Sequence, residues 1–558
     1  MNAKSRRGLA LLLALVMGVS ALTSCTEQET TQNPKDETDN VSVILESDNY
    51  SISPNELAVY EYQAALSGLT NQFWYYQYGL IQDTEGMTKL FSNAYNYAYY
   101  MLPKAMEQGT YKAQAYDLAH QHVVYCEGAL SAGEDQKLKK DVEAEVDQYI
   151  NDLKETAKSM DLSLKEYLQT YVGKSVKEND VRSAMEKYSL GSKYAEIRSA
   201  EISDALTLQE LTAHAEANKS VFYQTYYHSY KFNDPSLLDT LEKATSPEKL
   251  LIALTEHVLE QAYHQAYKTY VTDTSTEDPY GQDATRVKVR ETLLSLIGIQ
   301  NPETGEAYPN HFPENDTDAY NQAALRVVEN TFNQLNKELL QIKELSAFYT
   351  DLADPESYEK ASISQKWLFV EGRREGDQCI LAHPDGSYEW CIVSKVMALD
   401  EEMTRNVCYI KFTDEEAYTS KEKANAFLRA FLDNKSAEKF DELAVQLEII
   451  DPNASTLHEY VTQKAMTNIS DSLSSWLYEE GRAVGDADVI QAGDVHYVAY
   501  YAAENEANWC IQARDALTYV KLQAWFDETE KKINLQSHLD LPEVETQPHF
   551  SVDVRPIA

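Results

Sequence analysis

Few side chains in this chain combine the residue types and the spacing that chemistry requires. His120, His122 and Cys126 lie close together, and His122 and Cys126 are one helical turn apart, on one face of a helix. A zinc site needs three or four ligands that meet at one point, and no further residue completes this pair. We therefore expect these side chains to be packed or exposed, and the sequence predicts no metal site and no cofactor.

Reactive nucleophiles are equally scarce. The sequence shows no Ser-His-Asp catalytic triad, P-loop or dinucleotide-binding fingerprint in the structural context that those motifs need. Five cysteines follow Cys25 without any CxxC or other metal-ligand spacing: Cys126, Cys379, Cys391, Cys408 and Cys510. Cys379 and Cys391 lie nearly opposite each other about the turn Asp385-Gly386, so a disulfide between them stays open. The alternative is that these thiols are small buried apolar side chains.

Cys25 carries the clearest signal for a covalent modification. A positively charged start is followed by an apolar run, residues 8–22, which is too short to span a bilayer comfortably. Leu22-Thr23-Ser24-Cys25 then resembles the bacterial lipobox, in which the cysteine is diacylated and becomes the new N-terminus. The alternative is an ordinary secretory signal with a chance cysteine. We expect a protein held by its lipid on the extracytoplasmic face of the cell membrane, with no transmembrane helix later in the chain.

Length and charge indicate the number of domains and limit the kinds of partner that the protein can bind. The chain has 558 residues, which suggests three or four domains, and a formal net charge of −41. Removal of residues 1–24 takes away three positive charges and no acidic residue, which leaves −44. A nucleic-acid partner is excluded, because counterion release rewards basic surfaces. Residues 25–47 are acidic and contain no aromatic residue, a composition that is typical of a disordered tether.

One stretch of the chain occurs twice. Trp367–Asp377 (WLFVEGRREGD) returns as Trp476–Asp486 (WLYEEGRAVGD), with seven of eleven positions identical. Each copy runs into two apolar, β-branched segments around a turn, Pro384-Asp385-Gly386 in the first and Ala492-Gly493-Asp494 in the second. Such turns between apolar runs predict β-hairpins. The repeat therefore predicts a duplicated domain in which a helix end is followed by two antiparallel strands.

The remaining pattern is mainly helical, with capping signals at Ser53, Ser163 and Thr207. Strands are expected at 221–232 and 407–412, and helices at 246–272, 318–350 and up to Trp476. The sequence thus predicts the α+β class, with one mainly helical domain and two domains that hold small antiparallel sheets. We expect a signal peptide 1–24, a tether 25–47, a helical domain 48–220 completed by helix 511–533, sheet domains 221–398 and 404–510, and a tail 534–558.

The order strand, helix, helix, further helix and two strands resembles the parvulin domain. Lys439–Ala444 (KFDELA) is similar to a parvulin helix, and Trp476–Asp486 with the strand after it is similar to the parvulin ending. Ser163–Gly173 resembles a segment of the helical chaperone domain in extracytoplasmic foldases of the PrsA and SurA kind. This resemblance covers most of residues 48–530 and implies two parvulin-like domains beside a chaperone domain.

The resemblance also implies which residues would be catalytic, and here the chain departs from the family. Parvulins have a His on the first strand and a His on the last strand. The first position falls on Tyr409 in the second copy, and the last falls on either Tyr497 or His496. In the first copy Ser229 takes the first position, with His228 displaced by one. The Gly-rich segment of the family is absent, because no glycine lies between Glu448 and Ser475.

Function is therefore expected to be binding rather than efficient catalysis. The aromatic run Phe73, Trp74, Tyr75 and Tyr76 could line a groove for client chains, or it could be helix–helix core. We expect a membrane-anchored foldase or chaperone that binds unfolded secreted proteins. An active peptidyl-prolyl cis–trans isomerase and a non-catalytic surface scaffold are the alternatives.

Overall fold

The structure, a computed structural model, describes residues 43–83, 86–272, 283–312, 319–414, 418–451 and 454–539. Helices dominate, and the strands form three small antiparallel sheets, which confirms the α+β class. Contacts divide the chain into two compact units. One comprises the described parts of residues 1–211, 404–506 and 510–558, and the other those of residues 212–403 and 507–509. Among all these described residues, no helix is both long and apolar enough to cross a membrane.

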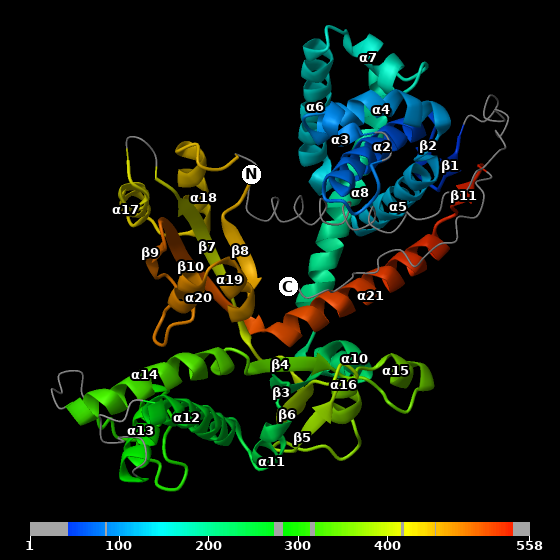
Figure 1. Ribbon diagram of the computed structural model, residues 1–558. Helices are drawn as coiled ribbons and strands as arrows, with labels where there is room; N and C mark the ends of the chain where they lie inside the picture. Colours follow the sequence, from blue (N-terminus) through cyan, green and yellow to red (C-terminus); the bar gives the residue numbers. More distant parts are fainter. Residues whose placement is uncertain are drawn as a thin grey trace. The chain divides into compact units, whose positions relative to one another are not determined.

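The N-terminal part of the first unit is a helical bundle, drawn from blue to green in Figure 1. Its helices are α2 (Pro54–Gln77), α3 (Met87–Leu90), α4 (Ala94–Gln108), α5 (Lys112–Ala132), α6 (Asp135–Ser159), α7 (Leu164–Tyr171) and α8 (Glu178–Ala205). The first unit ends at Leu211, within α9 (Leu208–Ala217). The predicted caps are confirmed. Ser53 and Ser163 each accept a hydrogen bond from the glutamate N–H three residues on, and that glutamate side chain bonds back to the cap. The helix starts therefore follow from the local sequence.

Both ends of the described chain lie in one sheet beside this bundle. β1 (Leu45–Glu46) lies between β2 (Ser51–Ile52) and β11 (Gln536–Ser537). The predicted tether 25–47 therefore extends too far, because Ile44 and Leu45 are buried in the core. The predicted tail from residue 534 is also corrected, since it supplies β11. Residues 25–42 and 540–558 lie outside the described residues.

Helix α21 (Asn508–Lys532) packs along the bundle before β11. The ring of Trp525 lies 5.4 Å from that of Tyr125 and packs on Gly128, where an added Cβ would meet the indole at 2.9 Å. Lys521 forms an ion pair with Glu210 at 2.6 Å. The predicted C-terminal helix at 511–533 is thus confirmed as a helix, and the bundle contacts it with apolar and charged side chains.

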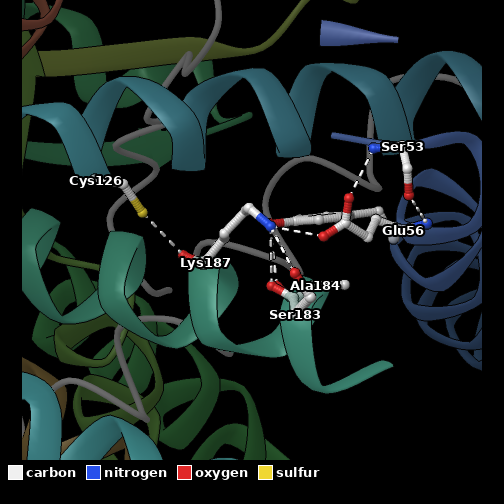
Figure 2. A network of polar contacts seen from close by, with 7 residues as sticks. Ser53, Glu56, Cys126, Ser183, Ala184 and Lys187 are labelled. Atoms are coloured by element: carbon white, nitrogen blue, oxygen red, sulfur yellow. Dashed lines mark hydrogen bonds and ion pairs between the residues drawn. The ribbon is translucent and has the colours of Figure 1, made fainter. Parts of the chain in front are cut away.

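A buried ion pair joins α2 to α8 (Figure 2). Nζ of Lys187 lies 2.6 Å from Oε1 of Glu56, and only 13% and 9% of these side chains are exposed. Glu56 also accepts a hydrogen bond from the backbone N–H of Ser53, and Lys187 donates to the hydroxyl of Ser183. Burial alone would raise the pKa of Glu56, but the charge of Lys187 and these hydrogen bonds lower it. One carboxylate therefore caps α2 and holds α8 against it.

The second repeat forms a four-stranded sheet in the first unit. Its elements are β7 (Met403–Phe412), α17 (Ser420–Phe431), α18 (Ala437–Gln446), β8 (Leu457–Val461), α19 (Gln463–Ile469), α20 (Asp471–Leu477), β9 (Ala487–Ala492) and β10 (Val495–Ala507). The strand order is β8-β7-β10-β9. One face packs on α17 and α18 through Phe427 and Phe440, and the other packs on α19 and α20 through Met466 and Trp476. Strand β8 corrects the sequence analysis, which expected helix there.

The first repeat forms a matching sheet in the second unit. Its elements are α10 (Lys219–Phe222), β3 (Tyr223–Phe232), the 3₁₀ turn η2 (Pro235–Leu237), α11 (Leu238–Leu241), α12 (Pro247–Thr272), α13 (Asp283–Leu296), α14 (Ala319–Leu339), β4 (Lys343–Phe348), α15 (Pro355–Lys360), α16 (Ile363–Leu368), β5 (Gln378–Ala382) and β6 (Tyr388–Leu399). The order β4-β3-β6-β5 repeats that of the other sheet. The helix expected over 318–350 ends at Leu339, because residues 343–348 pair with β3 instead.

The repeated stretch itself is a turn in which an arginine clamps a tryptophan. The guanidinium of Arg373 lies 4.3 Å from the ring centre of Trp367, and that of Arg482 lies 4.5 Å from that of Trp476. Each arginine also donates a hydrogen bond to the carbonyl of its own tryptophan. Trp476 is buried and Trp367 is partly buried. The end of the short helix is thereby fixed to the loop that follows it.

Glycine and aspartate complete the same turn in both copies. Gly376 and Gly485 have φ of +82° and +96°, a region that other residues rarely adopt. Their N–H groups donate to the carbonyls of Val393 and Tyr501, both at 2.8 Å, which starts the pairing of the hairpin. The shared aspartates accept a backbone N–H three residues back, at 3.0 Å in each copy. The duplication and both hairpins predicted from the sequence are therefore confirmed by matching bonds.

Loss of the buried cation should destabilise the helical bundle. Lys187→Ala leaves the Glu56 carboxylate buried without a partner, so we expect a loss of about 3–5 kcal/mol in urea unfolding at neutral pH. The pKa of Glu56 is lowered in the fold, so its contribution is present at neutral pH and disappears as the pH falls below 4.5. The cost of the substitution should shrink over the same range. Lys158→Ala, which removes an exposed ion pair with Glu155, should change stability little.

The Trp–Arg contact of the turn predicts that loss of Trp476 destabilises the second-repeat sheet. Trp476→Ala removes a ring of which 8% is exposed and leaves its arginine without a platform, so we expect a loss of roughly 3–5 kcal/mol. Hydrogen exchange of β9 and β10 would measure it. Trp74→Ala, at a ring that is 42% exposed, is the matched control and should leave exchange unchanged. Equal effects of the two substitutions would contradict the role of the turn.

Candidate functional site

Three rings from adjacent strands meet on one face of the second-repeat sheet. Tyr409 of β7 stacks on His458 of β8, with ring centres 4.2 Å apart and planes at 18°. Tyr497 of β10 meets Tyr409 edge-on at 6.2 Å. The strand order β8-β7-β10 places Tyr409 between the other two. We call these three residues the ring cluster.

The ring cluster resolves which residue of β10 shares a face with Tyr409. Neighbouring residues on a strand point to opposite faces, so Tyr497 and His496 cannot both do so. His496 lies on the opposite face, where its Nδ1 is 2.9 Å from the hydroxyl of Ser420 at the start of α17. Of the three candidates named from the sequence, Tyr409 and Tyr497 therefore come together, and His496 is separate from them.

Sequence reasoning missed His458. Its strand, β8, has five residues and no clear alternation, so the local pattern gave no strand signal. The buried carboxylate of Asp441 holds the start of β8, because it accepts hydrogen bonds from the N–H and the hydroxyl of Thr456 at 2.7 and 2.6 Å. The carbonyl of Thr456 in turn accepts the N–H of Tyr409. A helix residue thus positions His458 beside the two tyrosines.

Burial favours the uncharged forms of Tyr409 and His458. Burial raises the pKa of Tyr409, with a further contribution from Tyr497. Burial lowers the pKa of His458, and the negative charge of Asp441 opposes that shift only in part. Two phenols and a neutral imidazole can donate and accept hydrogen bonds, for example with a peptide carbonyl. None of them is an activated nucleophile.

The same two positions in the first-repeat sheet hold a different group. Matching hydrogen bonds pair Val393 with Tyr501, so Glu389 on β6 corresponds to Tyr497. Ser229 on β3 corresponds to Tyr409, and its hydroxyl donates to Oε1 of Glu389 at 2.5 Å. Where one sheet has an aromatic contact between these positions, the other therefore has a hydrogen bond to a carboxylate.

Glu389 is the centre of a buried polar group. Only 2% of it is exposed, and besides Ser229 it binds the hydroxyl of Ser364 and Nε2 of His383, both at 3.0 Å. Burial alone would raise the pKa of Glu389, but these hydrogen bonds outweigh it and lower the pKa. Both carboxylate oxygens are occupied, so Glu389 is held as an anchor between β3, α16 and the hairpin. It is not a free base.

The cysteines and histidines singled out from the sequence have separate partners. Cys379 and Cys391 lie directly opposite each other on β5 and β6, and both are free thiols. Nε2 of His122 lies 3.1 Å from the hydroxyl of Ser192, whereas His120 pairs with a glutamate of α21. Throughout the part of the chain that the structure describes, no three His, Cys, Asp or Glu residues are placed to hold a metal ion.

The aromatic run on α2 divides between core and surface. Phe73 is buried at 2% exposure, so it cannot contact a client and its selection as a binding residue is wrong. Trp74 is 42% exposed, and Tyr75 and Tyr76 are partly exposed. The core also explains the position of Phe73, since its ring lies 5.7 Å from that of the buried Tyr97 of α4.

Exposed apolar side chains gather where α2, α3 and α4 meet. Six of them are between 42% and 72% exposed: Trp74, Tyr78, Leu80, Leu90, Tyr95 and Tyr100. We call this set the aromatic surface. Ring contacts of 5.1–6.0 Å lead from Tyr78 through Trp74, Phe73, Tyr97 and Phe91 to Tyr100. Large exposed apolar patches mark interaction sites in other proteins, so this set is a candidate binding surface.

Comparison with known proteins adds no family to this geometry. No family model matches the chain, and none of the curated proteins matches its sequence. Cys25, the predicted lipidation site, lies outside the described residues.

The Glu389 group predicts a pH-dependent stability for the first-repeat sheet. Glu389→Gln should cost about 1.5–3 kcal/mol at neutral pH, because a neutral amide replaces the charged acceptor. The folded-state pKa of Glu389 is lowered, so its stabilising effect is complete above 4.5 and disappears as the pH falls below that value. The gap between the two proteins in urea unfolding should close in acid. Glu371→Gln, at an exposed glutamate of the same unit, is the control, and a gap that does not narrow as the pH falls below 4.5 would contradict this account.

Proposed function

We propose that this protein is a lipid-anchored, extracytoplasmic chaperone of the parvulin-foldase type, which holds unfolded secreted chains and lacks efficient prolyl isomerase catalysis. The observation that carries the proposal is the aromatic surface. Six exposed apolar side chains on neighbouring helices give an unfolded chain a place to bury its own apolar residues, without a nucleotide or a metal. The shared strand order of the two sheets supports the parvulin resemblance.

The contents of the two sheets support holding over catalysis. Prolyl isomerisation needs hydrogen bonds and an apolar pocket that favour a twisted amide, over a barrier of about 18–20 kcal/mol. The family histidines are replaced by Tyr409 and Tyr497 in one sheet and by Ser229 and Glu389 in the other. In the first-repeat sheet the carboxylate of Glu389 already accepts hydrogen bonds from Ser229, Ser364 and His383. Glu389 is therefore held within the fold, which argues against a role as a free base.

An active isomerase is the second candidate, and one observation favours it. His458 brings an imidazole against Tyr409, so the second sheet has a histidine on the relevant face after all. A neutral imidazole and two phenols could together bind a twisted prolyl amide. The ring cluster is the only site for which we consider isomerase activity.

Client holding can be tested with the aromatic surface. The purified protein should suppress aggregation of an unfolded client, and Trp74→Ala/Tyr78→Ala/Tyr100→Ala should need about tenfold or more protein for equal protection. Each ring contributes about 0.5–1.5 kcal/mol beyond its buried area. Tyr418→Ala, at a ring that is 62% exposed in the second-repeat sheet region, should protect like the natural protein. Full protection by the triple variant would overturn the assignment of the surface.

Catalysis can be tested on a short prolyl peptide. Uncatalysed exchange takes tens to hundreds of seconds at 25 °C, so even weak acceleration is measurable. We expect almost none. Substantial acceleration that disappears in Tyr409→Phe/Tyr497→Phe or His458→Gln would make the ring cluster an isomerase site. If neither holding nor acceleration is found, a surface scaffold becomes the better account.

The anchor can be tested at Cys25. Cys25→Ala should move the protein from the membrane fraction to the medium, or leave it unprocessed, because the acyl chains would have no attachment point. Fractionation and mass measurement of the N-terminus would show which. Normal processing with equal membrane retention would disprove the lipid anchor.

A further inference from the structure

The aromatic surface occupies the least charged part of an acidic protein. Residues 62–103 contain three charged side chains, Asp83, Glu85 and Lys89, although a quarter of the whole chain is charged. All six members of the aromatic surface lie in this stretch. A client bound there would meet apolar side chains at the centre of the surface.

The helices around that surface carry an excess of negative charge. From residue 43 to residue 211 the sequence has 26 Asp and Glu against 15 Lys and Arg. Several of the basic residues are already neutralised by carboxylates of the same bundle, including Lys137, Arg182, Lys187 and Lys193. The field around the neutral aromatic surface therefore comes from the surplus carboxylates.

Charges at the edge of the surface do not reverse this balance. Glu107 follows Tyr100 by two turns of α4 and is exposed, as is Lys104 one turn after Tyr100. Asp83 lies before α3, where its carboxylate binds the N–H of Met87, and Lys89 is in that helix. Acidic and basic residues at the edge nearly cancel, so discrimination by charge must come from the wider bundle. Such a field acts over about 10 Å at 0.1 M salt and affects mainly the rate of association.

We infer that the aromatic surface selects cationic clients, namely unfolded segments whose aromatic or aliphatic residues are flanked by Lys or Arg. This inference rests on the proposed holding function and names its client class. The apolar core of the segment supplies the residence time on the surface. The basic flanks speed up the encounter with a bundle of opposite charge, and acidic flanks slow it down. A second copy of this chain is a poor occupant, because its own net charge is −41.

Three peptides test the inference on the full chain. They share one aromatic core and differ in four flanking residues, which are all Lys, all Gln or all Glu. In about 20 mM salt the Lys peptide should associate about tenfold or more faster than the Glu peptide, with the Gln peptide between them. In about 0.5 M salt the three rates should converge, because the field is screened. Dissociation rates should differ little.

Two variants separate the field near the surface from the total charge. Glu107→Lys should reduce the preference for the Lys peptide. Asp433→Lys changes the net charge equally, at an exposed position in the turn after α17, and should leave the preference unchanged. Equal association of the three peptides at low salt would overturn the inference while leaving the holding function intact. No binding of any peptide would instead overturn the proposed function. A preference that survives in 0.5 M salt would also overturn the inference, because it requires direct ion pairs.

Discussion

An arginine laid over a tryptophan at the end of a short helix is the contact on which both sheets depend. The guanidinium contacts the ring of Trp367 or Trp476 and binds the carbonyl of the same residue. The glycine and aspartate that follow turn the chain directly into the hairpin. The eleven-residue stretch therefore combines a cation–π contact, hydrogen bonds and a left-handed backbone conformation. These contacts limit which amino acids can occupy its tryptophan, arginine, glycine and aspartate positions. The glutamate shared by both copies, Glu371 and Glu480, is exposed.

The turn has the same contacts in both copies, although the side chains on the neighbouring strands differ. The two sheets have the same strand order, yet their corresponding positions hold Ser229 with Glu389 in one and Tyr409 with Tyr497 in the other. The first pair is joined by a hydrogen bond, and the second by an edge-on contact between two rings. Two sheets with the same strand order thus hold different side chains at corresponding positions. The chemistry of each site therefore has to be derived from its own residues.

The helical bundle is organised by a different kind of contact. Glu56 serves the N-terminus of α2 and the ammonium of Lys187 at once, so a local cap and a long-range contact share one carboxylate (Figure 2). The pairing of β1 with β11 brings the two ends of the described chain together. With its core filled in this way, the bundle leaves Trp74 42% exposed and Tyr78 72% exposed, although the two rings stack on each other. These exposed rings are the reason why we propose a binding role for this part.

The sequence by itself determined the features whose hydrogen bonds close within a few residues. The caps at Ser53 and Ser163, the two hairpins and the duplicated turn are of this kind, because partner and donor lie within one turn or one loop. Tertiary structure alone decided β4, β8 and β11, since each obtains its hydrogen bonds from a strand far away in the sequence. It also decided which aromatic residues of α2 are core, because apolar side chains occur on all sides of that helix. His458 and Glu389 became visible only through neighbours on other strands, where burial and cross-strand contact, which no local pattern encodes, fix their ionisation and partners.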